Sequence, residues 1–354
     1  MGGNALAPYG AKRVSKEVAG SMLQGLQSNL ALLSAAHGIT ARCEPIRAYR
    51  DKPDFGDLDV LVENTLFKVL PSEKIVAALQ GFYDAEIPWI KNGPVLSIGL
   101  PLEEGGCLQA DLISTPAVSF DFSAGYFAWN DLGNLVGRVA HKLGVKLGHD
   151  GLWLPMRDGT NLFDEILITH DFEEAIGFLG FDSEAWARGF DSLDQIYAFV
   201  VEGSRFNADI YKLENRNHTA RVRDRKRPVY MGFLQWVEQK SNLNAFEWNA
   251  DKSVYLKDIF AAFPETEKLH KASLERLAKT QAMKGRFNGQ IVSDLTGLSG
   301  KDLGHFMGRF KTDHAALLGS LETVSDAELA AAIKTAFQDG DFKQSPKIDD
   351  SPSP

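Results

Sequence analysis

Hydrophobic residues recur at helical spacing near the start of the chain. Between Ser15 and His37 the apolar positions fall every three or four residues, which predicts a helix that stops at Gly38. The preceding residues, 1–14, are rich in Gly and Ala and lack this period. We therefore expect them to form a loop-like N-terminal arm.

Strand-like patterns follow this helix. Residues 57–62 and 107–113 alternate polar and apolar positions, which predicts two strands. Between them, residues 72–82 favour a helix and residues 94–100 favour another strand. Helices and strands mixed in this way predict an α+β unit of about 100 residues with a mixed sheet.

From about residue 128 onward the apolar spacing is mostly helical. The first of these helices is predicted at 131–146. The others are expected near 171–180, 183–188, 191–202, 228–240, 253–263, 265–284, 300–318 and 326–337. The remaining C-terminal residues are rich in Pro, Ser and Asp, so we expect 339–354 to be a disordered tail.

Composition limits the function classes. The 354 residues include 44% hydrophobic and 24% charged residues, as is typical of soluble globular proteins. The net charge of −9 does not exclude a local basic face. Two distant cysteines exclude a Cys-rich zinc site and a disulfide framework, which favours a reducing, cytoplasmic compartment. We expect no membrane span, because no apolar run reaches about 18 residues.

Three aspartates form the strongest chemical pattern. Asp57 and Asp59 are two residues apart on a predicted strand, so their side chains share one face. Asp111 interrupts an apolar stretch of another predicted strand, where an unpaired charge is costly. Converging carboxylates repel one another unless a cation lies between them, and oxygen ligands of this kind suit Mg²⁺, with Mn²⁺ as a substitute. The alternative for Asp57 and Asp59 alone is a solvated pair on an edge strand.

The segment Arg47-Ala-Tyr-Arg-Asp-Lys-Pro-Asp-Phe-Gly-Asp-Leu-Asp59, with Asp111 following 52 residues later, resembles the DNA polymerase beta (family X) nucleotidyltransferases. That family carries a basic stretch, then Gly-Asp-x-Asp on a strand and a third Asp on a later strand. The resemblance implies that Asp57, Asp59 and Asp111 are catalytic metal ligands.

The resemblance continues downstream into the segment that opens the thumb subdomain of the family. It implies that Tyr126 and Phe127 line the sugar of the nucleotide. It also implies that Asp131 and Asn134 lie beside the base and that Arg138 reaches the minor groove or template. The i+3 and i+7 spacing from Asp131 places both later residues on one helix face.

The phosphate-binding turn differs from the family pattern. Ile46-Arg47 and Trp129-Asn130 stand where the family has Gly-Ser. Arg50 keeps a basic position, so we expect it to bind the β or γ phosphate, assisted by Arg47 or Lys52. The resemblance covers about residues 15–155.

A weaker resemblance lies near the C-terminus. Residues 287–310 are similar to a helical segment of CCA-adding tRNA nucleotidyltransferases and poly(A) polymerases, and the alternative is simply two helices packed across Gly-rich turns. The expected domains are an arm (1–14), a nucleotidyltransferase palm (15–120), a thumb-like subdomain (121–158), a helical domain that is a candidate for nucleic-acid binding (159–338) and the tail (339–354).

Residues 216–228 form a run of cations in an otherwise acidic chain. Arginines fork onto phosphates, and His218 or Tyr230 offers a ring for stacking on a base, so the run favours nucleic-acid contact. The alternative is a solvated helix face paired with local acids. We expect the nearby aromatic residues to be core; they are Phe206, Tyr211, Phe233 and Trp236.

The sequence therefore predicts transfer of a nucleotide from an NTP or dNTP to a nucleic-acid 3′-OH, with RNA or tRNA as the favoured acceptor. The enzymatic rivals are a templated family X-like DNA polymerase and an enzyme that modifies a protein or small molecule. The rival from another class is a non-catalytic nucleic-acid-binding module.

Overall fold

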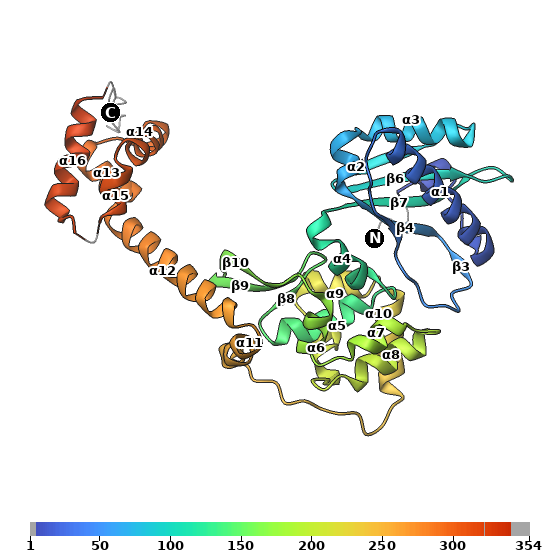
Figure 1. Cartoon of the computed structure of the whole chain (residues 1–354). Helices are drawn as coiled ribbons and strands as arrows, with labels where there is room; N and C mark the ends of the chain where they lie inside the picture. The colour runs from blue at the N-terminus through green and yellow to red at the C-terminus, as the bar shows by residue number, and fades with distance from the viewer. Residues whose placement is uncertain (1–4, 322, 341–354) are drawn as a thin grey trace, which may run out of the picture. The chain divides into compact units, whose positions relative to one another are not determined.

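The computed structural model describes residues 5–321 and 323–340 and divides into two compact units, Met1–Thr266 and Glu267–Pro354 (Figure 1). The fold is α+β, as predicted: a mixed sheet with helices is followed by a helical C-terminal region. Helix α12 (Pro264–Arg286) begins in the first unit and continues into the second.

A five-stranded sheet forms the base of the first unit. Its strands, in spatial order, are β2 (Cys43–Pro45), β4 (Asp57–Glu63), β7 (Cys107–Thr115), β6 (Val95–Pro101) and β5 (Trp89–Asn92). Strands β4 and β7 run parallel, and the other neighbours are antiparallel. This pairing joins the two Asp-bearing strands directly.

One face of the sheet is covered by helices. Helix α1 (Lys16–Ala36) begins after Ser15, whose hydroxyl caps the first turn by accepting from Val18 N. Helix α1 packs with α3 (Ser72–Tyr83) on the sheet, and the short α2 (Asn64–Val69) follows β4 (Figure 1). The even-numbered residues of β4 face this core, so its odd-numbered residues face the other side.

The described part of the N-terminal arm is largely irregular and is anchored to the first unit. Leu6 is fully buried, and its N–H donates to Gln109 Oε1 at 3.0 Å. Strand β1 (Val14–Ser15) pairs with β3 (Asp54–Phe55). Burying the side chain of Leu6 and pairing the backbone hold these residues on the first unit.

The second part of this unit is built on one hydrophobic core that draws residues from 122 to 259. Its helices are α4 (Phe120–Phe127), α5 (Leu132–Lys142), α6 (Phe172–Phe178), α7 (Ser183–Arg188), α8 (Leu193–Glu202), α9 (His218–Asp224), α10 (Pro228–Glu238) and α11 (Leu256–Ala262). The four aromatic residues expected in the core belong to it. Helix α4 lies between the sheet and the other helices (Figure 1).

The predicted boundary between residues 158 and 159 falls inside a β-hairpin. Strands β9 (Leu152–Asp158) and β10 (Asn161–Thr169) pair antiparallel, and β8 (Lys146–Leu147) extends their sheet. Residues 121–158 and the first half of the predicted helical domain therefore share one core. The helix predicted to reach residue 146 ends at Lys142, because Gly144 turns the chain with φ +83°.

The second unit is helical. Its core joins α13 (Gly289–Thr296), α14 (Gly300–Asp313), α15 (Ala315–Gly319) and α16 (Asp326–Gln338). Both interpretations of residues 287–310 contain two helices across a Gly-rich turn, and the structure has them, with Gly297 at φ +74° between α13 and α14. The helix predicted at 300–318 is interrupted at His314.

Most of the predicted tail, residues 341–354, lies outside the described residues. Among the helices that the structure describes, none combines the length and apolar character needed to cross a membrane.

Candidate active site

The three predicted aspartates converge on one face of the sheet. Asp59 of β4 lies directly beside Asp111 of β7, and Asp57 is one pleat away on the same face as Asp59. One carboxylate oxygen from each residue can be chosen so that all three lie within 4.8 Å of one another. The spacing predicted from two separate strands is therefore realised by a single parallel strand pair.

Burial limits how far water can stabilise the negative charges of this triad. Asp111 is 1% exposed and accepts a hydrogen bond from Gln109 Nε2 at 2.9 Å. Burial raises the pKa of Asp111, and it raises the pKa of Asp59 to about 6, with the neighbouring carboxylates adding to the effect. An all-oxygen donor set in which the charges repel one another fits a divalent cation such as Mg²⁺.

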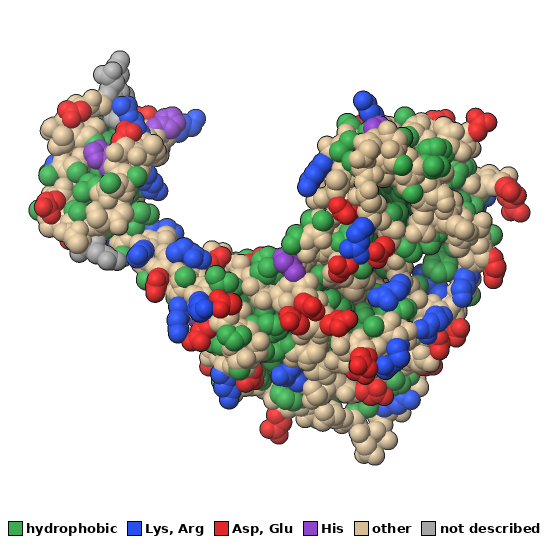
Figure 2. Space-filling model, in the orientation of Figure 1, with side chains coloured by type: hydrophobic (Ala, Val, Ile, Leu, Met, Phe, Trp, Pro, Cys, Tyr) green, Lys and Arg blue, Asp and Glu red, His purple; other side chains and the backbone are tan. Residues whose placement is uncertain are grey.

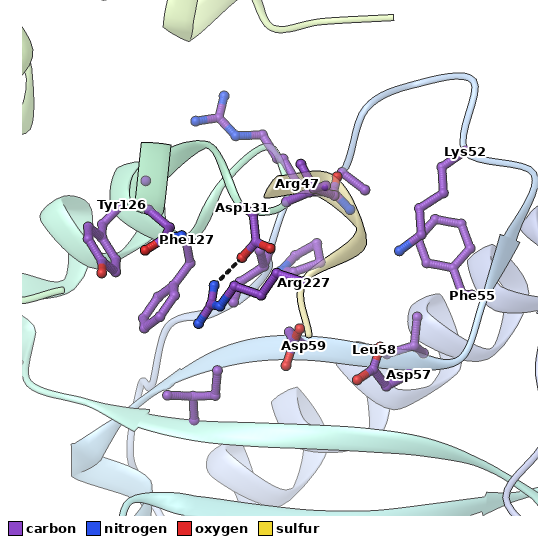
Figure 3. Close-up of a pocket in the computed structure, with 18 of the residues that line it drawn as sticks. Arg47, Lys52, Phe55, Asp57, Leu58, Asp59, Tyr126, Phe127, Asp131 and Arg227 are labelled. Carbon is purple, nitrogen blue, oxygen red and sulfur yellow. Dashed lines mark hydrogen bonds and ion pairs between the residues drawn. The ribbon is translucent and has the colours of Figure 1, made fainter. Parts of the chain in front are cut away.

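A cavity of about 500 Å³ opens over Asp57 and Asp59, and Asp111 is buried behind them. We call one side of it the sheet wall, which consists of Phe55, Asp57, Leu58, Asp59 and Ile113. Its helical wall consists of Tyr126, Phe127, Asn130, Asp131, Gly133, Asn134, Arg223, Arg227 and Val229. Figure 3 shows the labelled side chains of the two walls pointing toward the same space. A cavity of this volume is of the size that encloses small-molecule ligands.

Most of the predicted nucleotide-binding residues line this cavity. They are Arg47, Lys52, Tyr126, Phe127, Asp131 and Asn134. The Nδ2 atom of Asn134 is buried and has no hydrogen-bond partner among the residues that the structure describes. A donor left in this way is costly unless a ligand or solvent accepts its hydrogen bond.

Two predicted residues are not part of the cavity. Arg50 pairs with Asp191, and its guanidinium also donates to the carbonyl of Arg188. Arg138 donates from both Nε and Nη2 to Ile210 O, at 3.1 and 3.0 Å. Both side chains therefore donate hydrogen bonds to backbone carbonyls of the first unit.

Two cations, Lys52 and Arg47, line the cavity. The Lys52 Nζ atom is 4.3 Å from the centre of the Phe55 ring. Burial lowers the pKa of Lys52, while the carboxylates of Asp57 and Asp59 oppose that change. The Arg47 guanidinium lies 4.9 Å from a ring centre of Trp129, and burial lowers its pKa. Lys52 is thus placed to meet an anion beside the triad, whereas the Arg47 guanidinium lies against Trp129 and donates to Ala187 O at 3.5 Å.

At Trp129-Asn130 the chain forms a tight turn without the glycine of the family pattern. Trp129 and Asn130 adopt φ values of +64° and +63°, a left-handed conformation that disfavours side chains. The turn is nevertheless held, since Trp129 N donates to Arg47 O at 2.6 Å and its ring Nε1 donates to Trp186 O at 2.9 Å. The surrounding packing therefore enforces a turn that glycine would adopt without strain.

Residues 46–52, here called the strap, connect the two walls of the cavity. Ile46 N donates to Asp59 O at 2.9 Å on the sheet side. Asp51 N donates to Asp191 O at 2.8 Å on the helical side. The strap is thus bonded to both parts of the first unit.

Sequence reasoning missed two arginines of the helical wall. Arg223 and Arg227 line the cavity, and Arg227 forms an ion pair with Asp131 (Figure 3). Burial raises the pKa of Tyr126, and these two guanidinium groups oppose that rise. The basic run was the only signal, and nothing in its pattern indicates that it faces the aspartates.

One member of the basic run has a structural role instead. Arg216 is buried and pairs with the fully buried Asp224 at 2.6 Å. For this residue the expected nucleic-acid contact is wrong, because its side chain is not exposed. Its charge is compensated inside the fold.

Comparison of the chain with protein-family models and with curated proteins found no match. Its function is therefore inferred from the geometry of this cavity.

Proposed function

We propose that the chain is a Mg²⁺-dependent nucleotidyltransferase of the DNA polymerase beta superfamily. It transfers a nucleotide from an NTP or dNTP to a nucleic-acid 3′-OH and releases pyrophosphate. The observation that carries this proposal is the aspartate triad of β4 and β7, of which Asp57 and Asp59 line a nucleotide-sized cavity that also presents Arg47 and Lys52.

Each residue then has a distinct task. Asp57 and Asp59 would hold Mg²⁺, or Mn²⁺ as a substitute, and Asp111 would complete the site. When bound, the ions lower the pKa of the attacking hydroxyl and stabilise the charge of the leaving pyrophosphate. Arg47 and Lys52 bind the phosphates through charge-assisted hydrogen bonds.

We favour an untemplated acceptor such as RNA or tRNA over a templated DNA polymerase. The resemblance gives Arg138 a template-reading role, but its Nε and Nη2 groups donate to Ile210 O and the residue does not line the cavity. The basic segment that reaches the cavity through Arg223 and Arg227 supports a nucleic-acid acceptor. Both cysteines are free, which agrees with a cytoplasmic location.

Incorporation of labelled nucleotides tests this proposal. The full chain is incubated with each labelled NTP and dNTP, Mg²⁺ or Mn²⁺, and one acceptor: total tRNA, a single-stranded oligonucleotide or a primed template. Asp59→Asn should reduce incorporation by about 10³-fold or more, because the metal is lost. The control, Glu63→Gln on the same strand, should retain activity.

The other outcomes separate the rivals. Incorporation that requires the primed template would identify a polymerase. Label that moves to protein would identify a protein-modifying enzyme. Binding of a triphosphate with no incorporation under any condition would identify a non-catalytic module. Undiminished activity in Asp59→Asn would refute the assignment of the triad.

A further inference from the structure

The turn between α9 and α10 lies at the rim of the cavity. Arg223 in the last turn of α9 and Arg227 just before α10 both line the cavity. Between them, Arg225 and Lys226 are exposed and Asp224 is buried. Within the part of the chain that the structure describes, neither Arg225 nor Lys226 has a carboxylate partner. The turn therefore presents free cations immediately outside a cavity that holds two more.

This turn is held rigidly from below. Asp224 is fully buried and pairs with Arg216 at 2.6 Å. The backbone closes over it, with Lys226 N donating to Arg223 O and Arg227 N donating to Asp224 O, both at 3.1 Å. Binding of a ligand here costs the protein little conformational entropy, because the backbone of the turn is already hydrogen-bonded.

The positive charge of the turn is concentrated in a few residues. Asp224 offsets Arg216 and lies 3.3 Å from Arg223 Nε, and Asp131 pairs with Arg227. The cations beyond these pairs have no such compensation, in a chain whose net charge is −9. On the face drawn in Figure 2, acidic and basic side chains are interspersed over the first unit. A concentration of arginine at one turn is thus a specific feature, and arginine forks match phosphate oxygens.

The first turn of α10 adds to this field. Helix α10 has 11 residues and begins at Pro228, and Val229 of its first turn lines the cavity. The start of a helix carries partial positive charge and unpaired N–H groups, which favour an anion.

We propose that the α9–α10 turn (residues 223–227) binds the phosphate backbone of a single-stranded nucleic acid whose 3′ end enters the cavity. Arg223 and Arg227 contact the last phosphates inside, and Arg225 and Lys226 contact the preceding phosphates outside. The triphosphate is left to Lys52 and Arg47 beside the triad. A cavity of about 500 Å³ is of the size that holds a small-molecule ligand, which favours the end of a single strand over a duplex. The strand direction rests on the proposed function, whereas binding of the strand does not.

Binding of a fluorescent 12-nucleotide single strand, RNA in one arm and DNA in the other, tests the proposal. Anisotropy is measured across a salt series with the full chain, Arg225→Gln/Lys226→Gln, and a control of equal charge change, Lys68→Gln/Lys74→Gln, at exposed positions of α2 and α3. Loss of two phosphate contacts should weaken binding by about fivefold or more and reduce the salt slope by about 1.4. The control should match wild type.

Two results would overturn the proposal: equal affinities of the two double variants, or no binding of either strand at low salt. The variant Asp59→Asn separates this proposal from the proposed function, since it should bind the strand normally and incorporate nothing. Strand binding that depends on Arg225 and Lys226 in a wild-type chain without activity would refute the transferase and retain the turn. If Arg225→Gln/Lys226→Gln incorporates nucleotides with an unchanged KM for the acceptor, the transferase is retained and strand binding by the turn is refuted.

Discussion

A buried aspartate lies behind each wall of the cavity, and the two residues are in opposite electrostatic situations. Asp111, behind the sheet wall, is next to two further carboxylates and accepts hydrogen bonds from neutral groups, Gln109 and Ser97. Asp224, behind the helical wall, pairs directly with Arg216. Burial of a charge is costly unless a partner compensates it. Asp224 thus has its partner within the fold, whereas the partner that we propose for the triad is a cation.

Breaking the pair below the helical wall should have the largest effect on stability. Asp224→Asn leaves the Arg216 charge buried and uncompensated, which should lower the free energy of unfolding by about 3–5 kcal/mol. All six tryptophans precede residue 267, so tryptophan fluorescence in a urea titration reports on the first unit alone. The exposed Asp194→Asn on α8 should change stability by less than about 0.5 kcal/mol. A similar small change in Asp224→Asn would show that the pair does not support the wall.

Neutralising the sheet wall should act in the opposite direction. The folded-state pKa of Asp59, about 6, exceeds its ordinary value of 3.8, so its favourable contribution is complete below pH 3.8 and is lost as pH rises through 6. Without metal at pH 7, Asp59→Asn should therefore be more stable than wild type by about 2 kcal/mol, and the difference should shrink toward pH 4.

Mg²⁺ should narrow this difference. At ten times its dissociation constant it stabilises wild type by about 1.4 kcal/mol, and it should not stabilise Asp59→Asn. Urea titrations with EDTA and with Mg²⁺, each at pH 4 and pH 7, provide the four required values. If Asp59→Asn were less stable than wild type in EDTA at pH 7, and Mg²⁺ stabilised both equally, the triad would not be a metal site.

The partly exposed pair within the helical wall should have the smallest effect. Asp131 and Arg227 have side chains that are 25% and 27% exposed, and a pair that solvent reaches contributes about 1 kcal/mol or less. Asp131→Asn should therefore lower stability by no more than this amount in the same urea titration. A loss as large as that expected for Asp224→Asn would place both pairs in one buried network and remove the distinction between them.

The sheet wall could be predicted from the sequence because its geometry is local. Strand alternation alone places Asp57 and Asp59 on one face, and a charge within the apolar residues around Asp111 indicates a special site. Pairing of the two strands was the only long-range contact needed. The structure supplies it in register, with Asp59 beside Asp111.

The helical wall could not be predicted in this way. Arg223 and Arg227 reach the cavity only because a separate core carries their turn there. Arg50 and Arg138 were assigned from a resemblance in sequence position, yet long side chains bind whichever acceptor the fold brings near. The hairpin of β9 and β10 was missed for a related reason: its apolar positions are shared with a helical core and give no clean alternation.

The strap has a consequence for how such a cavity selects its ligands. Because residues 46–52 are hydrogen-bonded to Asp59 on one side and Asp191 on the other, the two walls are tied together before any ligand arrives. Enzymes that close around a correct substrate can reject a wrong one at the closing step. Under the proposed function, we therefore expect substrates to be discriminated by their initial fit in the cavity and not by closure of a lid.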